Sequence, residues 1–400
     1  MGYLIDRLDH QGRGITKVDE KITFVKNALP NELVDIKITR SNSKINEAII
    51  TNIEKKSDIR IEPICKYYNE CGGCNLMHIP YEEELKYKEN KIRQVIEKFT
   101  TIDSSKVKKI IGNNIKDYRN KVTLHVKDKK LGYYNNKSNE ITNIDKCYIV
   151  DEKINKIIDD LYKIDLTNIY EIVIRSSRYY KDTMVVFKII DDIQIDLDVD
   201  TILTYKDKKY NIIKGKGYIL DKIGKYTYKI SPDSFFQINT IQAQNLYDKV
   251  LDYLKPTAND NILDLYCGTG TIGIYVSEKA KHIKGIEINK YAVEDANENK
   301  KINNVNNIDF ECLDASDIDE LKDHFDKIII DPPRSGLDKK TINYILKSNA
   351  NRVVYVSCDP ITLARDLEIL KDYYIIKEIT PVDMFSRTYH VECVSILERK

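Results

Sequence analysis

The spacing of apolar residues changes along the chain, and each pattern predicts a different kind of structure. In residues 3–54, short β-rich or alternating runs lie at 22–25, 34–38 and 47–53. Turn-forming residues separate them, at Gly12, Gly14, Pro30-Asn31 and Ser41-Asn42-Ser43. Short strands with turn signals between them predict a small β-barrel.

The middle of the chain combines one helical stretch with a longer β-rich one. Residues 81–99 have helical composition, and one face would carry Leu85, Ile92, Val95, Ile96 and Phe99. Strand-like runs follow at 122–126, 172–174, 184–190, 193–199 and 226–230. This pattern predicts a β-rich central domain.

After residue 231, strands and helices alternate. Asn239 or Thr240 can cap a first helix that ends near Pro256. Apolar strands are predicted at 262–265, 283–288, 308–313, 327–330 and 353–356, and helices at 271–280, 290–303, 338–347 and 360–370. Such alternation predicts an α/β fold with a doubly wound, mostly parallel, Rossmann-like sheet. The predicted domains are 1–55, 56–230 and 231–400, and the helix at 82–99 is a candidate to dock on the last of them.

Composition narrows the class of protein. With 400 residues, 42% hydrophobic and 32% charged, the chain suits two or three globular domains and not a disordered protein. No stretch approaches the ~18 apolar residues of a membrane span, and the first twenty residues lack the apolar core of a signal peptide. We therefore expect a cytoplasmic protein, without a membrane or protein partner and monomeric, whose eight cysteines are reduced thiols, ligands or nucleophiles.

The near-zero net charge of +1 hides an asymmetry. Residues 1–230 carry 43 Lys and Arg against 35 Asp and Glu, whereas residues 231–400 carry 21 against 28. A basic front half suits contact with a polyanion such as RNA. Chance together with AT-biased codon usage, which would also explain the many Lys, Ile, Asn and Tyr residues, is the alternative, so the charge alone leaves both explanations open.

A glycine turn follows the first strand of the C-terminal domain. The segment Cys267-Gly268-Thr269-Gly270 lets a ligand approach the next helix, and Glu287 ends the following strand, where a carboxylate can bind ribose hydroxyls. Asp264, just before the turn, favours a ligand with a cationic amino group and a sulfonium. S-adenosylmethionine therefore suits the site better than a dinucleotide, whose pyrophosphate needs bare amides and positive charge.

Three more polar residues stand at the ends of strands. Asp331 opens the stretch Asp331-Pro332-Pro333-Arg334, Cys358 lies at the tip of the next strand, and Glu392 opens the last one. Ligands of such sheets bind at the carboxyl ends of the strands, so Asp331 and Cys358 should face the same crevice as the glycine turn. A helix N-terminus after Cys358 would favour its thiolate, and burial would raise the pKa of Glu392 and suit it as a base.

The second concentration of thiols lies near the front. Cys65, Cys71 and Cys74 fall within ten residues, which in a reducing compartment indicates a metal, and Cys147 is the candidate fourth ligand. The spacing departs from the paired C-x2-C motifs of zinc sites and from the C-x3-C-x2-C motif of radical enzymes. The residues alone leave zinc and an iron–sulfur cluster open.

Taken together, these motifs resemble the RNA uracil-5 methyltransferases. The resemblance rests on Ser357-Cys358-Asp359-Pro360-x-Thr362-Leu363-Ala364-Arg365-Asp366, on Asp331-Pro332, on His390-x-Glu392, on Phe236-Gln237-Ile238-Asn239 and on Asp264-Leu265-Tyr266-Cys267-Gly268. The front resembles the RNA-binding TRAM barrel through Gly12-Arg13-Gly14 and Phe24-Val25-x-x-Ala28-Leu29-Pro30.

The resemblance implies S-adenosylmethionine as methyl donor and a uridine of RNA as acceptor. Cys358 would be the nucleophile and Glu392 the general base. The donor site would comprise Gln237, Tyr266, Glu287 and Asp331, with Asp314 a further candidate near the adenine. Members with this cysteine spacing carry a 4Fe-4S cluster, here on Cys65, Cys71, Cys74 and Cys147.

A cluster together with a front barrel resembles the bacterial enzymes that act on 23S ribosomal RNA, so rRNA is the favoured substrate. Cluster-bearing archaeal relatives act on tRNA, which is the alternative. A cytosine-5 methyltransferase is disfavoured because Arg334 stands where that family has a cysteine. An iron–sulfur oxidoreductase would leave Cys358 and Glu392 unexplained, and a non-catalytic RNA-binding or chaperone protein would not need them.

Overall fold

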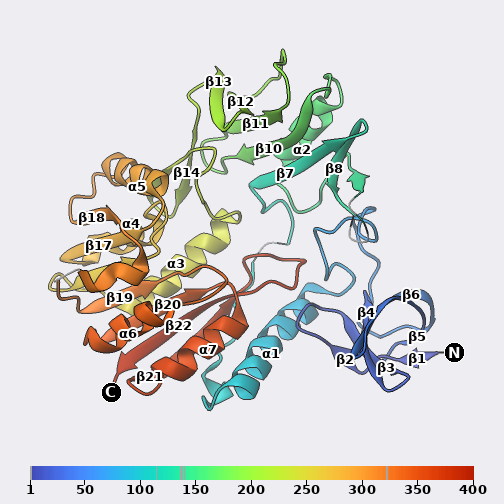
Figure 1. The fold of residues 1–400 in the computed structure, drawn as a ribbon, viewed down its shortest axis with the longest axis horizontal. Helices are drawn as coiled ribbons and strands as arrows, with labels where there is room; N and C mark the ends of the chain where they lie inside the picture. The colour runs from blue at the N-terminus through green and yellow to red at the C-terminus, as the bar shows by residue number, and fades with distance from the viewer. Residues whose placement is uncertain (1, 114, 136–137, 139, 321–322) are drawn as a thin grey trace.

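The computed structural model describes residues 2–113, 115–135, 138, 140–320 and 323–400. In this part of the chain, a small barrel, a central sheet, a hairpin and a C-terminal sheet follow one another (Figure 1). In this view the central sheet lies at the top, the barrel at the lower right and the C-terminal sheet at the lower left.

The barrel has strands in the order β1-β5-β6-β4-β3-β2. These are β1 (Tyr3–Leu4), β2 (Arg7–Leu8), β3 (Gly14–Val18), β4 (Lys21–Lys26), β5 (Leu33–Ser41) and β6 (Ile45–Lys55). The first chain segment pairs with β5 through β1 and with β3 through β2, which closes the sheet on itself. The three predicted runs are confirmed as β4, β5 and β6.

Gly14 begins strand β3, although the sequence pattern assigns it to a break. A Cβ at this position would lie 2.8 Å from side-chain atoms of Ala28 and Ile5. The glycine therefore allows close packing inside the barrel and does not mark a turn. A single sequence cannot distinguish these two uses of glycine.

The central sheet has the order β13-β12-β11-β10-β7-β8-β9. Its strands are β7 (Lys121–Lys127), β8 (Lys130–Tyr134), β9 (Ile141–Asn143), β10 (Ile169–Ser176), β11 (Thr183–Ile189), β12 (Thr201–Lys206) and β13 (Lys209–Lys214). The runs at 122–126, 172–174 and 184–190 are confirmed. The run at 193–199 is not a strand, because β12 occupies the edge of β11 and the alternating apolar residues of the run pack against the core without a ladder.

Helix α2 (Glu152–Leu161) was not predicted within this β-rich region. Asp151 caps it through the Lys153 amide, and its buried face carries Ile154, Ile157, Ile158 and Leu161. The helical spacing was therefore present in the sequence, in a helix of only ten residues.

The C-terminal sheet has the order β18-β17-β16-β19-β20-β22-β21. Its strands are β16 (Asn261–Leu265), β17 (His282–Glu287), β18 (Ile308–Cys312), β19 (Lys327–Ile330), β20 (Arg352–Ser357), β21 (Tyr374–Val382) and β22 (Glu392–Arg399). Strands β16 to β20 run parallel, and β22 is antiparallel to both of its neighbours. The predicted Rossmann-like fold is confirmed.

Helices cover both faces of this sheet, near the predicted positions. They are α3 (Thr240–Leu254), α4 (Thr271–Val276), α5 (Lys290–Ile302), α6 (Lys339–Lys347) and α7 (Pro360–Leu370). Of the two capping candidates, Asn239 is the N-cap of α3, because its side chain accepts from the Gln242 amide at 3.2 Å.

Two earlier segments contribute to the core of the C-terminal sheet. Helix α1 (Tyr81–Phe99) lies beside α7 (Figure 1), and its Ile92, Val95 and Ile96 join the cluster that contains strand residues of β16, β19 and β20. Phe99 was expected on this face but is 46% exposed, because the helix ends there. The hairpin of β14 (Ile219–Ile223) and β15 (Tyr226–Ile230) packs with α3.

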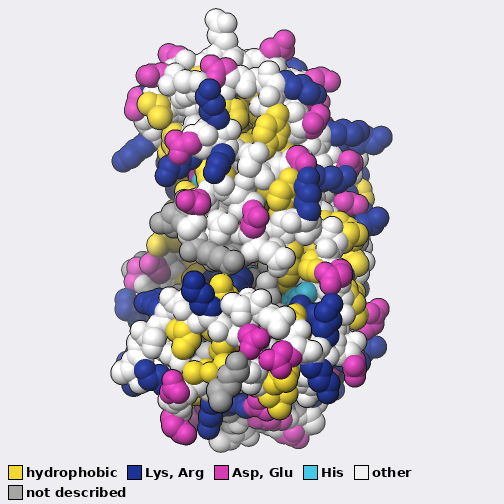
Figure 2. Space-filling model, turned by 90° about the vertical axis from the view of Figure 1, so that its right-hand side faces the viewer, with side chains coloured by type: hydrophobic (Ala, Val, Ile, Leu, Met, Phe, Trp, Pro, Cys, Tyr) yellow, Lys and Arg dark blue, Asp and Glu magenta, His cyan; other side chains and the backbone are white. Residues whose placement is uncertain are grey.

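On the face seen in Figure 2, basic and acidic side chains are interspersed, and neither kind gathers into one large patch. None of the helices in the described part of the chain combines the length and the apolar character needed to cross a membrane.

Candidate active site

The turn after β16 adopts a backbone that is suited to holding a ligand. Tyr266, Gly268 and Gly270 all have positive φ, at 61°, 54° and 76°. A left-handed tyrosine costs free energy, and such strain is concentrated at functional sites. Among the described residues, apart from its two chain neighbours, no heavy atom lies within 4 Å of where a Cβ of Gly268 would stand, so there is open space beside the turn.

Glu287, at the end of β17, is bound to this turn. One carboxylate oxygen accepts from the Gly268 amide at 3.1 Å, and the other accepts from the Asn289 amide at 2.9 Å. These contacts fix the carboxylate beside the open side of Gly268. The geometry matches that of an acidic residue that binds ribose hydroxyls.

Buried acids face the turn from inside the sheet. Asp264 is 1% exposed, and neither carboxylate oxygen makes a hydrogen bond of standard geometry within the described residues. Burial, with the Asp331 carboxylate nearby, raises the pKa of Asp264 to about 8, and the Gly273 amide offsets this only in part. Burial likewise raises the pKa of Asp331 to about 7. A ligand that carries positive charge would complement these groups.

The other residues of the expected donor site are placed as follows. Gln237 is buried just before α3, and its backbone carbonyl accepts from Asn120 at 3.0 Å. Tyr266 is half-buried, with its hydroxyl 3.4 Å from that of Thr341. Asp314 is exposed beyond β18 and accepts from the Ser316 amide, 2.8 Å away.

Cys358 lies between the end of β20 and the start of α7. The Asp359 side chain caps α7 by accepting from the Ile361 and Thr362 amides at 3.0 Å, and Pro360 is the first helical residue. This local structure holds the Cys358 thiol, half-buried, at the carboxyl edge of the sheet.

The antiparallel strand β22 brings Glu392 to the same place. Ser357 of β20 is paired with Cys393 of β22. Continued by one position, that register sets Cys358 opposite Glu392, and the Glu392 carboxylate is close enough to raise the pKa of Cys358. The two groups are 34 positions apart in the sequence, and only the direction and register of β22 place them side by side.

Burial and nearby charges both shift the pKa values of Cys358 and Glu392. Burial, with the Asp331 carboxylate, raises the pKa of Glu392 to about 8, as expected for a buried base, while Arg334 lowers it. Burial also raises the pKa of Cys358 to about 11; Glu392 and Asp331 contribute, and Arg334 opposes them. Burial and the two acids thus act against the thiolate, in the opposite direction to the effect expected of the α7 N-terminus.

The four front cysteines surround one cavity. Cys65, Cys71, Cys74 and Cys147 all line a space of about 210 Å³, together with Tyr68, Met77, Arg119 and Tyr133 among others. Within the described residues, no three His, Cys, Asp or Glu side chains converge closely enough to hold a single metal ion. The four thiols therefore lie around the cavity and do not converge on one point.

A buried ion cluster between α1 and the loop before β22 was not predicted. Lys88 is fully buried, and its ammonium donates to Glu84 at 2.8 Å and to Asp383 at 2.5 Å. Arg387 adds a contact with Glu84 at 3.4 Å. The available signal was the spacing, because Glu84, Lys88 and Ile92 form one stripe at four-residue intervals, which puts charges on the apolar face.

The same loop joins the cysteine segment to the segment that carries Glu392. The backbone carbonyl of Arg387 accepts from the amides of Asn75 and Leu76 at 2.9 and 3.1 Å, directly after Cys74. Asn239 donates to the Met384 carbonyl at 3.2 Å. The cysteine cavity and the candidate reaction centre are thus linked through one hydrogen-bonded loop.

Comparison with known families identifies two parts of the chain. Residues 80–400 match the family model described as tRNA (Uracil-5-)-methyltransferase. Residues 4–51 match the TRAM domain.

Individual relatives agree over the full length. An uncharacterised RNA methyltransferase of Oceanobacillus iheyensis is 35% identical over 98% of this chain and 95% of its own, and one of Clostridium tetani is 35% identical over 97% and 94%. Among solved structures, the tRNA (uracil-54, C5)-methyltransferase of Pyrococcus abyssi, in complex with S-adenosyl-L-homocysteine, aligns with a TM-score of 0.82 and 28% identity over 99% of this chain and all of that one.

Proposed function

Because the chain belongs to the family of S-adenosylmethionine-dependent RNA uracil-5 methyltransferases, we propose that it methylates carbon 5 of a uridine in 23S ribosomal RNA, with Cys358 as nucleophile and Glu392 as general base. The observation that carries the proposal is the pairing of β20 with β22, which puts a thiol and a buried carboxyl side by side at the carboxyl edge of the sheet.

The donor site fits a cationic ligand. Asp264 and Asp331 are acids with raised pKa values beside an open glycine turn, and in the part of the chain that the structure describes Asp264 has no hydrogen bond of standard geometry. Gln237, Tyr266, Glu287 and Asp331 would hold S-adenosylmethionine here. When bound, this donor supplies an electrophilic methyl group on a sulfonium.

Cys358 opens the reaction. Its thiol loses a proton to solvent, and the sulfur forms a bond to carbon 6 of the uracil, so that the electron pair of the C5–C6 double bond moves to carbon 5 and the neighbouring carbonyl oxygen. Carbon 5 then uses this pair to bond the methyl group, whose bond to the sulfonium sulfur breaks, and S-adenosylhomocysteine is the leaving group. Both faces of the ring must be reachable, so the uridine has to leave its stack, in a single-stranded or flipped state.

Glu392 closes the reaction. Its carboxylate takes the proton from carbon 5, the electron pair restores the C5–C6 double bond, and the bond to the Cys358 sulfur breaks. The pKa of about 8 that burial gives Glu392 makes it a stronger base than an exposed glutamate. Arg334, which lowers the pKa values of both Cys358 and Glu392, would favour their charged forms.

The cysteine cavity supports an iron–sulfur cluster. A 4Fe-4S cluster is bound by four thiolates spread around its volume, whereas zinc needs its ligands within bonding distance of one point. The four cysteines line one cavity of about 210 Å³, and we propose that it holds such a cluster. Cys65, Cys71, Cys74 and Cys147 would supply its ligands.

The substrate proposal follows the resemblance to bacterial enzymes that combine a barrel with a cysteine cluster. A second candidate is a tRNA uridine, which is favoured by the similarity to the archaeal tRNA (uracil-54, C5)-methyltransferase over the whole chain. We also propose that the enzyme acts as a monomer in the cytoplasm.

The test is methyl transfer by anaerobically purified protein from labelled S-adenosylmethionine to unmodified ribosomal RNA and tRNA in parallel. We expect label in a uridine of ribosomal RNA, and none with Cys358→Ala. Label only in tRNA would show that tRNA is the substrate and would leave the proposed Cys358 chemistry standing. Absence of label in both, with an assembled cluster, would refute the proposed mechanism.

A further inference from the structure

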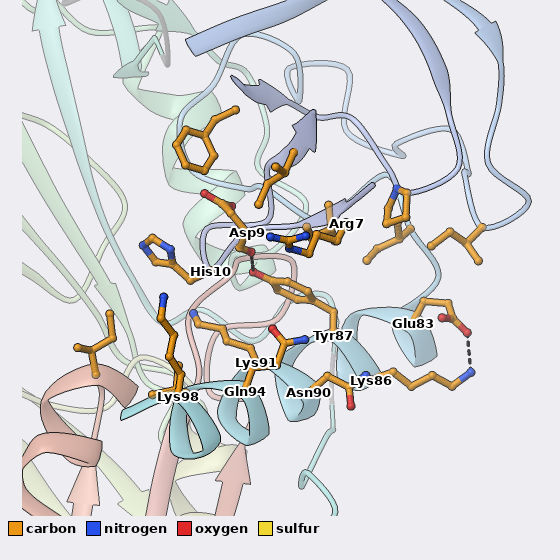
Figure 3. Close-up of a pocket in the computed structure, with 18 of the residues that line it drawn as sticks. Arg7, Asp9, His10, Glu83, Lys86, Tyr87, Asn90, Lys91, Gln94 and Lys98 are labelled. Atoms are coloured by element: carbon orange, nitrogen blue, oxygen red, sulfur yellow. Dashed lines mark hydrogen bonds and ion pairs between the residues drawn. The ribbon is translucent and has the colours of Figure 1, made fainter. Parts of the chain in front are cut away.

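A groove separates the TRAM barrel from helix α1 (Figure 3). It has a volume of about 650 Å³. Strands β2 to β4 and the adjoining turns form one wall, and α1 forms the other. Ile361, in the first turn of α7, borders one end, three residues after Cys358.

Helix α1 presents a polar stripe to this groove. Lys86, Asn90, Gln94 and Lys98 follow one another at four-residue intervals, so they lie along one side of the helix over ~18 Å. Lys91 lies beside them and, with Lys98, points toward the barrel (Figure 3). Asn90, Gln94 and Lys98 are exposed, so their polar groups are accessible to a ligand in the groove.

The acidic groups of the lining are already neutralised. Asp9 accepts from the Arg13 guanidinium at 2.7–2.8 Å, and Glu83 pairs with Lys86 at 2.6 Å. Lys91 and Lys98 form no ion pair within the described residues. Lys98 is exposed, whereas burial, together with Lys88, lowers the pKa of Lys91 to about 8, so Lys98 is the main source of positive charge in the groove. The barrel wall adds the ring of Phe24, which has the Arg13 guanidinium 4.3 Å from its centroid.

The groove adjoins chain segments that lead to the candidate reaction centre. Lys91 donates to the backbone carbonyl of Tyr389 at 2.9 Å, and its ammonium lies 5.3 Å from the centre of the Tyr389 ring. Tyr389 is three residues before Glu392. Ile361, which also lines the groove, is three residues after Cys358, so the groove borders segments close in sequence to both proposed catalytic residues.

We propose that this groove holds the single-stranded RNA segment next to the target uridine, with Lys91 and Lys98 at its phosphates and Asn90 and Gln94 reading base edges. Positive charge combined with an aromatic side chain is the usual surface for a single strand. Amides of Asn and Gln pair best with adenine, so adenines in this segment should strengthen binding. The inference rests on the proposed function, since it assigns the substrate strand of that reaction.

The test measures binding apart from catalysis. Fluorescence anisotropy of labelled oligo(U), with and without interspersed adenines, is followed over a range of KCl concentrations with the full-length protein and S-adenosylhomocysteine. Lys98→Ala should reduce the slope of log affinity against log salt by about 0.7, the value for one phosphate contact to a single strand. Lys347→Ala, an exposed lysine outside the groove, should leave the slope unchanged.

The double variant Asn90→Ala, Gln94→Ala should behave differently. It should bind adenine-containing RNA about 5- to 150-fold more weakly, the cost of one lost pair of base-edge contacts, with the salt slope unchanged. Both positions are exposed, so the fold should be retained.

The proposal is overturned if both groove variants match Lys347→Ala in affinity and slope, or if the wild type does not bind RNA. Methyl transfer to ribosomal RNA and tRNA is measured on the same preparations. If the wild type transfers methyl groups and the groove variants bind RNA as the wild type does, the groove is not the RNA site, and the proposed function stands. If RNA binding depends on the groove residues but no methyl group is transferred to either RNA, the proposed function is refuted and the role of the groove in RNA binding stands.

Discussion

Replacing Glu392 by glutamine removes the proposed base without changing the volume of the side chain. The earlier steps use Cys358 and the methyl donor, so they remain possible. The last step needs the proton of carbon 5 to be taken, because the bond between carbon 6 and sulfur cannot break otherwise. We therefore expect Glu392→Gln to accumulate a covalent complex of protein and methylated RNA.

The magnitude follows from the loss of general base catalysis. Such a residue contributes typically ~10²–10⁴-fold, so turnover should fall by that factor. This corresponds to about 3–5 kcal/mol of barrier at about 1.4 kcal/mol per tenfold change. The Cys358 thiol should ionise more readily in this variant, because the Glu392 carboxylate is one of the causes that raise the pKa of Cys358 to about 11. The variant thiol should titrate at lower pH.

Two assays check these expectations. Denaturing gel electrophoresis followed by intact mass spectrometry detects the adduct, and the pH dependence of iodoacetamide alkylation reports the pKa of the thiol. Glu294→Gln, at an exposed helical position, is the matched control and should behave as wild type. Turnover of Glu392→Gln within tenfold of wild type, with no adduct, would refute the assignment of the base.

Three further predictions concern the rest of the molecule. Cys147→Ser should lose the bound iron and its visible absorbance after anaerobic purification, whereas Cys312→Ser, at an exposed thiol outside the cavity, should retain both; equal iron content would contradict the cluster site. Lys88→Met removes the ammonium shared by two buried carboxylates and leaves Glu84 with the 3.4 Å contact to Arg387; it should lower the free energy of unfolding by about 3–5 kcal/mol in urea titrations, against under about 1 kcal/mol for Lys163→Met on the surface. The raised pKa of Asp264, about 8, means that the folded protein holds a proton that the unfolded chain releases near pH 4, so stability should fall as the pH rises from about 4 to 8. Asp264→Asn should flatten that fall in the melting temperature and weaken S-adenosylhomocysteine binding in calorimetry; an unchanged pH profile would show that this carboxyl is ionised throughout.

Local sequence patterns were sufficient for most of the C-terminal domain. The strand at 327–330 and the helix at 360–370 were predicted with the observed bounds, because buried parallel strands are continuous apolar runs and capped helices have the 3.6-residue period. In the central region the same rules missed α2, a short helix among strands. They also assigned a strand to 193–199, where alternation exists without a free sheet edge.

Charged residues on apolar faces were less readable from the sequence. Lys88 looks like an ordinary helical lysine until Asp383, almost three hundred residues later, is found against it. The same holds for α1 as a whole, whose apolar face could have completed the central domain and instead completes the core of the C-terminal sheet.

The sequence by itself determined which residue types stand at the tips of strands and how the front cysteines are spaced, because both depend on neighbours along the chain. Only the tertiary structure decided which of them meet. The antiparallel direction of β22 sets Glu392 opposite Cys358, and folding brings Cys147 to the cavity that the other three cysteines line. Such encounters depend on the direction and register of segments that are distant in the sequence, and no local pattern encodes either.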